Sequence, residues 1–256
     1  MNYYSDTFSR MMHMYVGTNV DWITEYPTFY HVSSRLSSAW YNFIVPQVND
    51  VNNLDQTTVI HIGQTEKDFG TDVGLYINQS ILDNYQTFLQ EKKFKLIGNE
   101  TYLTLTTKDK VPVELPQGYT ISSEYNINNV IDVLKKCFPD WPEEKDYSNM
   151  YEQYKLTGQE DRIFETFCVY FENQIVGAAS ISIDQNLNLG YLHNDGIINE
   201  HRRKGLHTAL INVRNNFGLE YKITDMVTIV DDKANSFPSF LKSGFQIADK
   251  FYLYSR

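Results

Sequence analysis

Residues 196–210 read GIINEHRRKGLHTAL, and this stretch decides how the whole sequence is interpreted. An aliphatic strand ends at 197–198, a basic turn follows at 202–204, and a helix begins at Gly205. The first N–H groups of a helix have no partner inside the helix, and the helix dipole adds positive potential there. Glycine allows a left-handed backbone or a close approach of another group. The stretch therefore predicts an anion site, with an ordinary solvated basic turn as the alternative.

The basic turn stands out because the rest of the chain is acidic. The 256 residues carry a net charge of −10, whereas residues 196–222 hold five Lys or Arg against two Glu. Such a chain is a poor partner for nucleic acid, which needs a basic face. No apolar run reaches the ~18 residues that a membrane-spanning helix needs. Residues 1–10 are polar, and residues 11–16 are too short for a signal-peptide core, so we expect a cytoplasmic protein without membrane contact.

Cysteine and histidine usage argues against a metal centre. Cys137 and Cys168 are the only cysteines and form no Cys-x-x-Cys pair, which disfavours a disulfide scaffold and a zinc ribbon. We expect two buried thiols. His13, His31 and His61 have no metal-like spacing with carboxylates, so no metal is predicted.

Two parts of the chain meet near residue 112. The stretch 108–118 contains two prolines and a glycine among charges, and neither a helical nor a strand period crosses it. We therefore expect domains at 1–111 and 112–256, of mixed α/β (α+β) class. Predicted strands in the second part cover 119–125, 164–171, 175–183, 187–198, 225–230 and 245–254. A turn at 172–174 predicts that the strands 164–171 and 175–183 form a hairpin. Predicted helices there cover 126–138, 141–158, 202–217 and 235–242.

The end of the first part is similar to the end of the second. A predicted helix at 85–92 leads through Phe94 into a strand at 100–105, much as the helix at 235–242 leads through Phe245 into the last strand. The similarity indicates either an internal duplication or a chance match of two helix–strand units.

The loop and the downstream Gly-Phe pair together resemble the GNAT superfamily of N-acetyltransferases. Arg202 and Gly205 match the first and fourth positions of the family's Arg/Gln-x-x-Gly-x-Gly/Ala loop, and Ile197 matches the aliphatic residue that ends the preceding strand. A stretch that starts at Asn235 and ends in Gly-Phe at 244–245 is similar to the second signature. The whole chain resembles tandem GNAT proteins, whose amino-terminal domain has lost the CoA loop. The resemblance implies two GNAT-like domains, each with a mixed, mostly antiparallel sheet flanked by helices.

The resemblance also implies a reaction and a set of contacts. It implies acetyl-CoA as co-substrate, direct attack by an amine, and an acceptor that is a small molecule or a peptide. The CoA pyrophosphate is expected on the loop amides, and the pantetheine arm and thioester oxygen on the strand end. The implied CoA contacts are Ile197, Ile198, Arg202, Arg203, Lys204, Gly205, Leu206, His207, Thr208 and Asn235. The alternatives are a non-catalytic CoA-binding or regulatory module and an interaction protein that keeps only the fold.

The strand before the loop supplies candidates for the general base. By strand alternation, Tyr191, His193 and Asp195 are expected on one face, with Ile197 after them. GNAT enzymes often place a base four or six positions before the residue that Ile197 matches, and histidine titrates near neutrality. His193 is the preferred candidate, and the alternative is a histidine that only hydrogen-bonds within the sheet.

Two positions depart from the family pattern. His207 stands where Gly or Ala is usual, so its ring either caps a phosphate or obstructs it. Phe240 stands where a tyrosine often protonates the departing thiolate, and it has no proton to give. The sequence does not indicate the acceptor or the oligomeric state.

Overall fold

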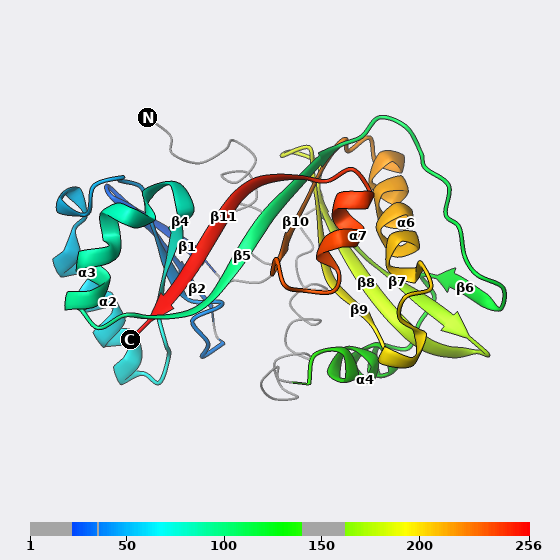
Figure 1. Cartoon of the computed structure of the whole chain (residues 1–256), viewed down its shortest axis with the longest axis horizontal. Coiled ribbons are helices and arrows are strands. Elements are labelled where there is room, and N and C mark those ends of the chain that lie inside the picture. The colour runs from blue at the N-terminus through cyan, green and yellow to red at the C-terminus, as the bar shows by residue number, and fades with distance from the viewer. Residues whose placement is uncertain (1–21, 35, 140–161) are drawn as a thin grey trace. The chain divides into compact units, whose positions relative to one another are not determined.

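A computed structural model describes residues 22–34, 36–139 and 162–256 of the chain (Figure 1). These residues form two compact units: the first extends to Tyr102 and includes Ile247–Arg256, and the second is Leu103–Gln246. His13 and the helix predicted at 141–158 lie outside the described residues. Both described units mix helices with strands, which confirms the predicted fold class.

The first unit is a sheet with the strand order β1-β2-β3-β4-β11-β5. Its strands are β1 (Trp22–Tyr26), β2 (Phe29–Ser33), β3 (Phe43–Pro46), β4 (Gly74–Asn78), β11 (Gln246–Ser255) and the first part of β5 (Lys95–Thr106). Its helices are η1 (Val51–Asn53), α2 (Gln56–Asp68), η2 (Gln79–Tyr85) and α3 (Gln86–Glu91). Buried aliphatic and aromatic side chains of α2, β4 and η2 form its core, and Asp55 caps α2 by accepting from the N–H of Thr58.

The last strand of the chain belongs to this first unit. β11 pairs antiparallel with β4, from Phe251↔Asn78 to Tyr254↔Leu75. The Phe251 ring is fully buried and stacks on Tyr76 with 4.6 Å between the ring centroids. The structure thus places β11, which lies at the end of the predicted second domain, in the compact unit of the amino-terminal half. The division into GNAT-like domains at 111/112 stays a prediction.

The second unit has the strand order β5-β10-β9-β8-β7-β6. Its further strands are β6 (Tyr119–Ser122), β7 (Arg162–Phe171), β8 (Gln174–Asp184), β9 (Leu189–Ile197) and β10 (Asp225–Val230). Its helices are α4 (Ile127–Cys137), η3 (Asn199–His201), α6 (Leu206–Glu220) and α7 (Phe237–Lys242). The hairpin of β7 and β8 confirms the prediction, and its turn uses the left-handed residues Glu172 and Asn173.

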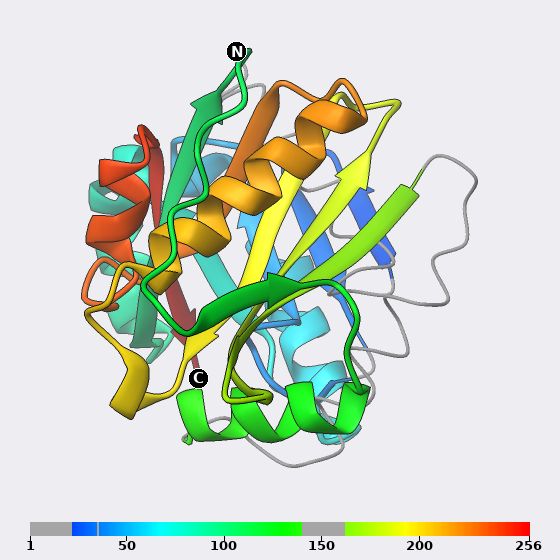
Figure 2. The ribbon, with the colours of Figure 1, turned by 90° about the vertical axis from the view of Figure 1, so that its right-hand side faces the viewer.

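Alternating side chains of β8 divide the second unit into two packed layers. Ala179, Ile181 and Ile183 pack in one cluster with residues of α6, whereas Ala178 packs in another with residues of α4. In Figure 2, α6 (orange) crosses the sheet and α4 (green) runs along its lower end. The sheet of this unit is therefore covered on both faces.

The two helix–strand segments that are similar in sequence share a backbone conformation where the helix ends. Lys93 (φ 62°) follows α3 and Gly244 (φ 91°) follows α7, each in the left-handed region. The next residue then bonds back into the helix: Phe94 N–H to the Leu89 carbonyl at 2.9 Å, and Phe245 N–H to the Phe240 carbonyl at 3.1 Å. Left-handed residues commonly end helices in this way. The similarity noted in the sequence thus extends to the geometry of the turn.

Candidate active site

The parallel strands β9 and β10 are paired over only part of their length and then separate. Their pairing runs from Leu189↔Asp225 to Leu192↔Thr228, while β9 continues to Ile197 and β10 to Val230. A bulge in β9 accompanies this separation: Ser180 of β8 pairs with His193 and Ala178 pairs with Gly196, so β9 has one extra residue between these pairs. Asn194 adopts φ 56° within the bulge. Bulges bend a strand and increase its twist, which opens the end of β9 on its β10 side.

The bulge corrects the predicted arrangement of the catalytic candidates. Tyr191 and His193 lie opposite Ser182 and Ser180, on the α4 face of the sheet. Past the extra residue the alternation is reversed, so Ile197 packs in the α6 cluster and Asp195 contacts side chains of α6. The prediction that Tyr191, His193 and Asp195 share one face is therefore wrong, because strand alternation holds only where no residue is inserted.

The loop after β9 ends at a helix start with the predicted features. Gly205 is the N-cap of α6 at φ 80°, and a Cβ built on it meets nothing within 4 Å, so the backbone conformation and not space requires glycine. Arg203 is also left-handed, at φ 61°. The intrahelical bonds begin with Ala209 N–H to the Gly205 carbonyl at 3.1 Å, which leaves the three amides of residues 206–208 at the positive end of the helix. The helix begins at Leu206, directly after the Gly205 start predicted from the loop and later than the start of the range predicted from periodicity, 202–217.

The three basic side chains of the loop have different surroundings. Arg202 Nε donates to the Ile197 carbonyl at 2.7 Å. Lys204 Nζ donates to the Tyr119 hydroxyl at 2.9 Å, and that oxygen also lies 2.8 Å from His201 Nδ1. Arg203 is exposed. Arg202 and Lys204 therefore brace the loop against the strand end and β6, while Arg203 faces solvent.

Ile197 and Ile198, both predicted to contact CoA, direct their N–H groups to opposite edges of β9. Ile198 N–H donates to the Val176 carbonyl of β8 at 3.0 Å. Because successive N–H groups of a strand point to opposite edges, the Ile197 N–H points to the open side next to β10. Of the two, Ile197 has the N–H that is directed away from β8.

A buried ion pair links the bulge to α6. Arg214 has no exposed surface; its Nη1 contacts Asp195 Oδ1, and its Nη2 donates to Asp195 Oδ2 at 2.6 Å. The guanidinium also donates to the carbonyls of Leu210 at 2.9 Å and Ser180 at 3.0 Å. Burial opposes ionisation of Asp195, but the charge of Arg214 and the neighbouring His207 outweigh it and lower the pKa of the carboxyl. The sequence contains one hint of this pair, a basic residue among the mostly apolar residues on the inner side of a helix.

His207 belongs to the same cluster. Its Nε2 lies 3.2 Å from Asp195 Oδ2, and its ring meets Phe240 edge-on with 5.3 Å between centroids. Phe240 is 2% exposed and packs on Phe245, so it is a core residue in this structure. The His207 ring thus points into the fold and away from the surface at the start of α6.

His193 is buried within a small aromatic and polar group. Its Nε2 lies 2.9 Å from the Ser182 hydroxyl, and its ring stacks on Tyr191 with 4.9 Å between centroids. Burial lowers the pKa of His193 to about 3, with a smaller opposing effect from Asp195. The ring is therefore neutral near pH 7, which makes it a weak base.

The remaining predicted contacts differ in exposure. The Leu206 side chain is buried in the core, Thr208 is half-buried, and Asn235 is exposed ahead of α7, which begins at Phe237. Cys137 and Cys168 are free thiols, and burial raises their pKa values to about 11 and about 12. Cys168 is buried and Cys137 is half-buried, so the prediction of two buried thiols is correct for Cys168 only. Among the described residues, no group of His, Cys, Asp or Glu is arranged to hold a metal ion. No helix in the described ranges is long and apolar enough to cross a bilayer.

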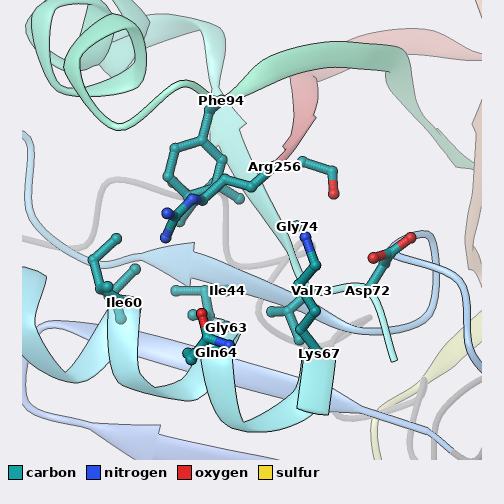
Figure 3. Close-up of a pocket in the computed structure, with 13 residues that line it drawn as sticks. Ile44, Ile60, Gly63, Gln64, Lys67, Asp72, Val73, Gly74, Phe94 and Arg256 are labelled. Carbon is teal, nitrogen blue, oxygen red and sulfur yellow. The ribbon is translucent and has the colours of Figure 1, made fainter. Parts of the chain in front are cut away.

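The first unit contains a small pocket of its own. It has a volume of about 70 Å³ and lies between α2, β3, β4 and the end of β11. Figure 3 shows the Arg256 side chain alongside the Phe94 ring, with Gly63 and Gln64 of α2 on the other side. Ligand pockets typically measure about 300–1,000 Å³. This pocket is therefore too small for a ligand of the size of CoA.

Comparisons with known proteins identify the second unit. Residues 127–245 match the acetyltransferase (GNAT) family. Residues 127–245 of the chain therefore form an acetyltransferase domain of the GNAT family. No curated protein sequence matches it.

Solved structures show the same fold at low sequence identity. A GCN5-related N-acetyltransferase from Kribbella flavida is 12% identical with a TM-score of 0.70, over 100% of this chain and 96% of that one. One from Sphaerobacter thermophilus is 10% identical with a TM-score of 0.69, over 90% and 76%. A tandem GNAT protein from the clavulanic acid biosynthesis pathway is 12% identical with a TM-score of 0.63, over 90% and 78%. At these identities the likeness concerns the fold alone.

Proposed function

We propose that this protein transfers an acetyl group from acetyl-CoA to the nitrogen of an amine, in a small molecule or a peptide. One observation carries the proposal: the open end of β9 adjoins a helix start that has three amides at its positive end. This pairing of a strand edge with an anion site suits a ligand that is amide-bearing at one end and phosphorylated at the other, as CoA is. An acidic protein with two free thiols also suits a cationic amine and the reducing cytosol.

The residues of the loop fit the pyrophosphate of CoA. Arg203 and Gly205 both adopt left-handed conformations, which also occur in known anion-binding nests. The amides of Leu206, His207 and Thr208 add donors, and the exposed Arg203 adds a positive charge. Arg202 and Lys204 hold the loop in this conformation through Ile197 and Tyr119.

The open side of β9 fits the pantetheine arm and the reacting carbonyl. Acetyl-CoA, when bound, supplies an acyl group activated as a thioester. The Ile197 N–H, on the open side, can donate to the carbonyl oxygen as negative charge develops on it. His193, four residues earlier, is neutral at pH 7 and can accept a proton without first losing one, although its low pKa limits the driving force.

The alternative is a CoA-binding module without catalysis. Two observations favour it: the lowered pKa of His193 weakens the candidate base, and the buried Phe240 offers no proton to a thiolate. Both functions share the CoA site, so binding alone does not separate them.

Two measurements on the full chain test the proposal. Isothermal titration calorimetry with CoA is expected to show binding, and absence of binding would refute both functions. Release of free thiol from acetyl-CoA in the presence of a panel of amines is expected to exceed the rate without protein. Binding without thiol release across the panel would leave the non-catalytic module.

A further inference from the structure

The position of His207 raises a steric problem for the anion site. It is the second residue of α6, so its own amide is one of the three donors at the helix start. A side chain here can extend over those amides or fold beneath them. In this structure it folds beneath: the side chain is 15% exposed, and its ring lies between Asp195 and Phe240.

The helix itself leaves a further χ1 rotamer open to this residue. Inside a helix, the preceding turn blocks the χ1 +60° rotamer of most side chains. His207 has no preceding helical turn, because α6 begins only one residue earlier. Rotation about χ1 therefore swings the imidazole toward the surface at the helix start, where it covers the amides that a phosphate needs.

Asp195 lies at ion-pair distance from the inward ring, and Arg214 fixes the position of Asp195. The carboxylate contacts the ring through Oδ2 and the guanidinium through both oxygens, while Arg214 is tied to the carbonyls of Leu210 and Ser180. Such pairs are a weak source of stability, since replacing both buried charges by apolar residues is often neutral or stabilising. Stability therefore does not account for the presence of this buried ion pair, and another role is needed to explain it.

We infer that the Asp195–Arg214 ion pair retains the His207 ring inside the fold and thereby keeps the start of α6 open to the pyrophosphate of CoA. This inference rests on the proposed CoA site. Asp195 and Arg214 are positioning residues in this scheme, and neither touches the ligand. His207 acts only by where its ring lies.

A rescue experiment tests the retention of His207. In the double variant Asp195→Leu/Arg214→Met the pair is replaced by apolar side chains, and the ring loses its partner. We expect the CoA dissociation constant, measured by calorimetry, to rise at least tenfold while the midpoint of thermal unfolding stays near that of the parent protein. Adding His207→Ala removes the ring and is expected to bring the dissociation constant back to within about threefold of the parent.

A second Arg–Asp pair in the same unit provides a matched control. Arg162 Nε lies 3.2 Å from Asp184 Oδ2, and these side chains are 14% and 8% exposed. The variant Arg162→Met/Asp184→Leu also replaces a largely buried pair, at the far end of β8, and is expected to bind CoA like the parent.

The outcomes distinguish failure of the proposed CoA site from failure of the inferred role of the Asp195–Arg214 pair. If the parent protein does not bind CoA, the proposed function fails and this inference fails with it. If the parent binds and the Asp195→Leu/Arg214→Met variant binds equally well, only the inference is overturned. The same holds if the triple variant stays as weak as the double, because the pair then acts on binding by a route other than His207.

Imidazole nitrogen NMR of the parent protein gives a test that does not depend on the folding of any variant. We expect the His207 nitrogens to keep the shifts of a ring in contact with a carboxylate before and after CoA is added. Shifts of a solvent-exposed ring in either state would overturn the inference.

Discussion

Arg202 Nε donates to the carbonyl oxygen of Ile197 at 2.7 Å, so the first residue of the loop is tied to the last residue of the strand. This bond closes the chain reversal between β9 and α6 and occupies a carbonyl at the open strand edge. Arg202 therefore contributes to the site by shaping the loop, a role that a loop pattern alone does not distinguish from direct contact with phosphate.

Removing the Arg202 donor is expected to weaken CoA binding by loosening the loop. Arg202→Leu loses the bond to Ile197, and we expect the CoA dissociation constant from calorimetry to rise roughly fivefold to tenfold, as for loss of one hydrogen bond of about 1–1.5 kcal/mol. Arg202→Gln keeps a side-chain N–H donor and is expected to retain most of the affinity. Equal losses in both variants would show that the charge, not the bond, matters.

Arg203 and Lys204 are expected to differ in their effect on CoA. Arg203 is exposed next to the helix start, so Arg203→Ala is expected to weaken CoA about tenfold or more, because hydrogen bonds to charged groups contribute ~1.5–3 kcal/mol. Lys204→Ala is expected to have a smaller effect, since its Nζ is bonded to Tyr119. Calorimetry at low and high salt measures both. A larger loss for Lys204→Ala would contradict this assignment of roles.

Gly205 is expected to resist substitution because of its backbone conformation. Gly205→Ala places a Cβ on a left-handed residue and is expected to lower the free energy of unfolding by about 1–2 kcal/mol. Gly205→Asn is expected to cost less, because asparagine tolerates this conformation. Gly63 of α2 is a matched control: a Cβ there meets nothing within 4 Å and its φ is not left-handed, so Gly63→Ala is expected to be neutral or stabilising. Urea denaturation measures all three, and a stable Gly205→Ala would contradict the argument.

His193→Ala is expected to reduce turnover on the order of 10²-fold, with little change in CoA affinity, if His193 accepts the proton. Because burial holds its pKa near 3, the pH–rate profile of the parent is expected to lack an inflection near 6.5 from this group. His193→Gln keeps a polar contact to Ser182 and separates loss of the base from loss of packing. Full activity of His193→Ala at neutral pH would remove the catalytic assignment and leave the CoA site intact.

The lowered pKa of His193 also predicts how stability depends on pH. Between about pH 6.5 and pH 3 the unfolded chain binds a proton on this ring and the folded chain does not, so stability falls as pH is lowered through that window. Within this window, the free energy of unfolding changes by about 1.4 kcal/mol for each pH unit. His193→Gln is therefore expected to reduce the loss of unfolding free energy between pH 6.5 and 4.5 by roughly 2 kcal/mol. If urea denaturation shows the same pH dependence for His193→Gln as for the parent, the pKa of His193 is not lowered by folding. The pKa of buried His31 is also lowered, so His31 adds a pH dependence in the same direction, and this contribution is the same in both proteins.

Local sequence was sufficient to predict the loop, the helix that follows it and the β7–β8 hairpin. Each is set by short-range physics: strand and helix periods, and the left-handed backbone that glycine allows at residue 205. The Gly-Phe turn at 244–245 is local in the same sense, and its hydrogen bond to Phe240 spans five residues. These features need no knowledge of the rest of the fold.

Tertiary structure alone decided how the site residues face one another. The bulge at Asn194 is a mismatch between two strands, so it is invisible in either strand by itself, yet it sends Asp195 to the face opposite His193. Arg214 reaches Asp195 across 19 positions because α6 packs on the end of β9, and that contact directs the His207 ring inward. The place of β11 beside β4 likewise depends on pairing between segments more than 170 residues apart. Periodicity describes each segment with respect to its own neighbours, whereas these contacts depend on which segments the folded chain brings together.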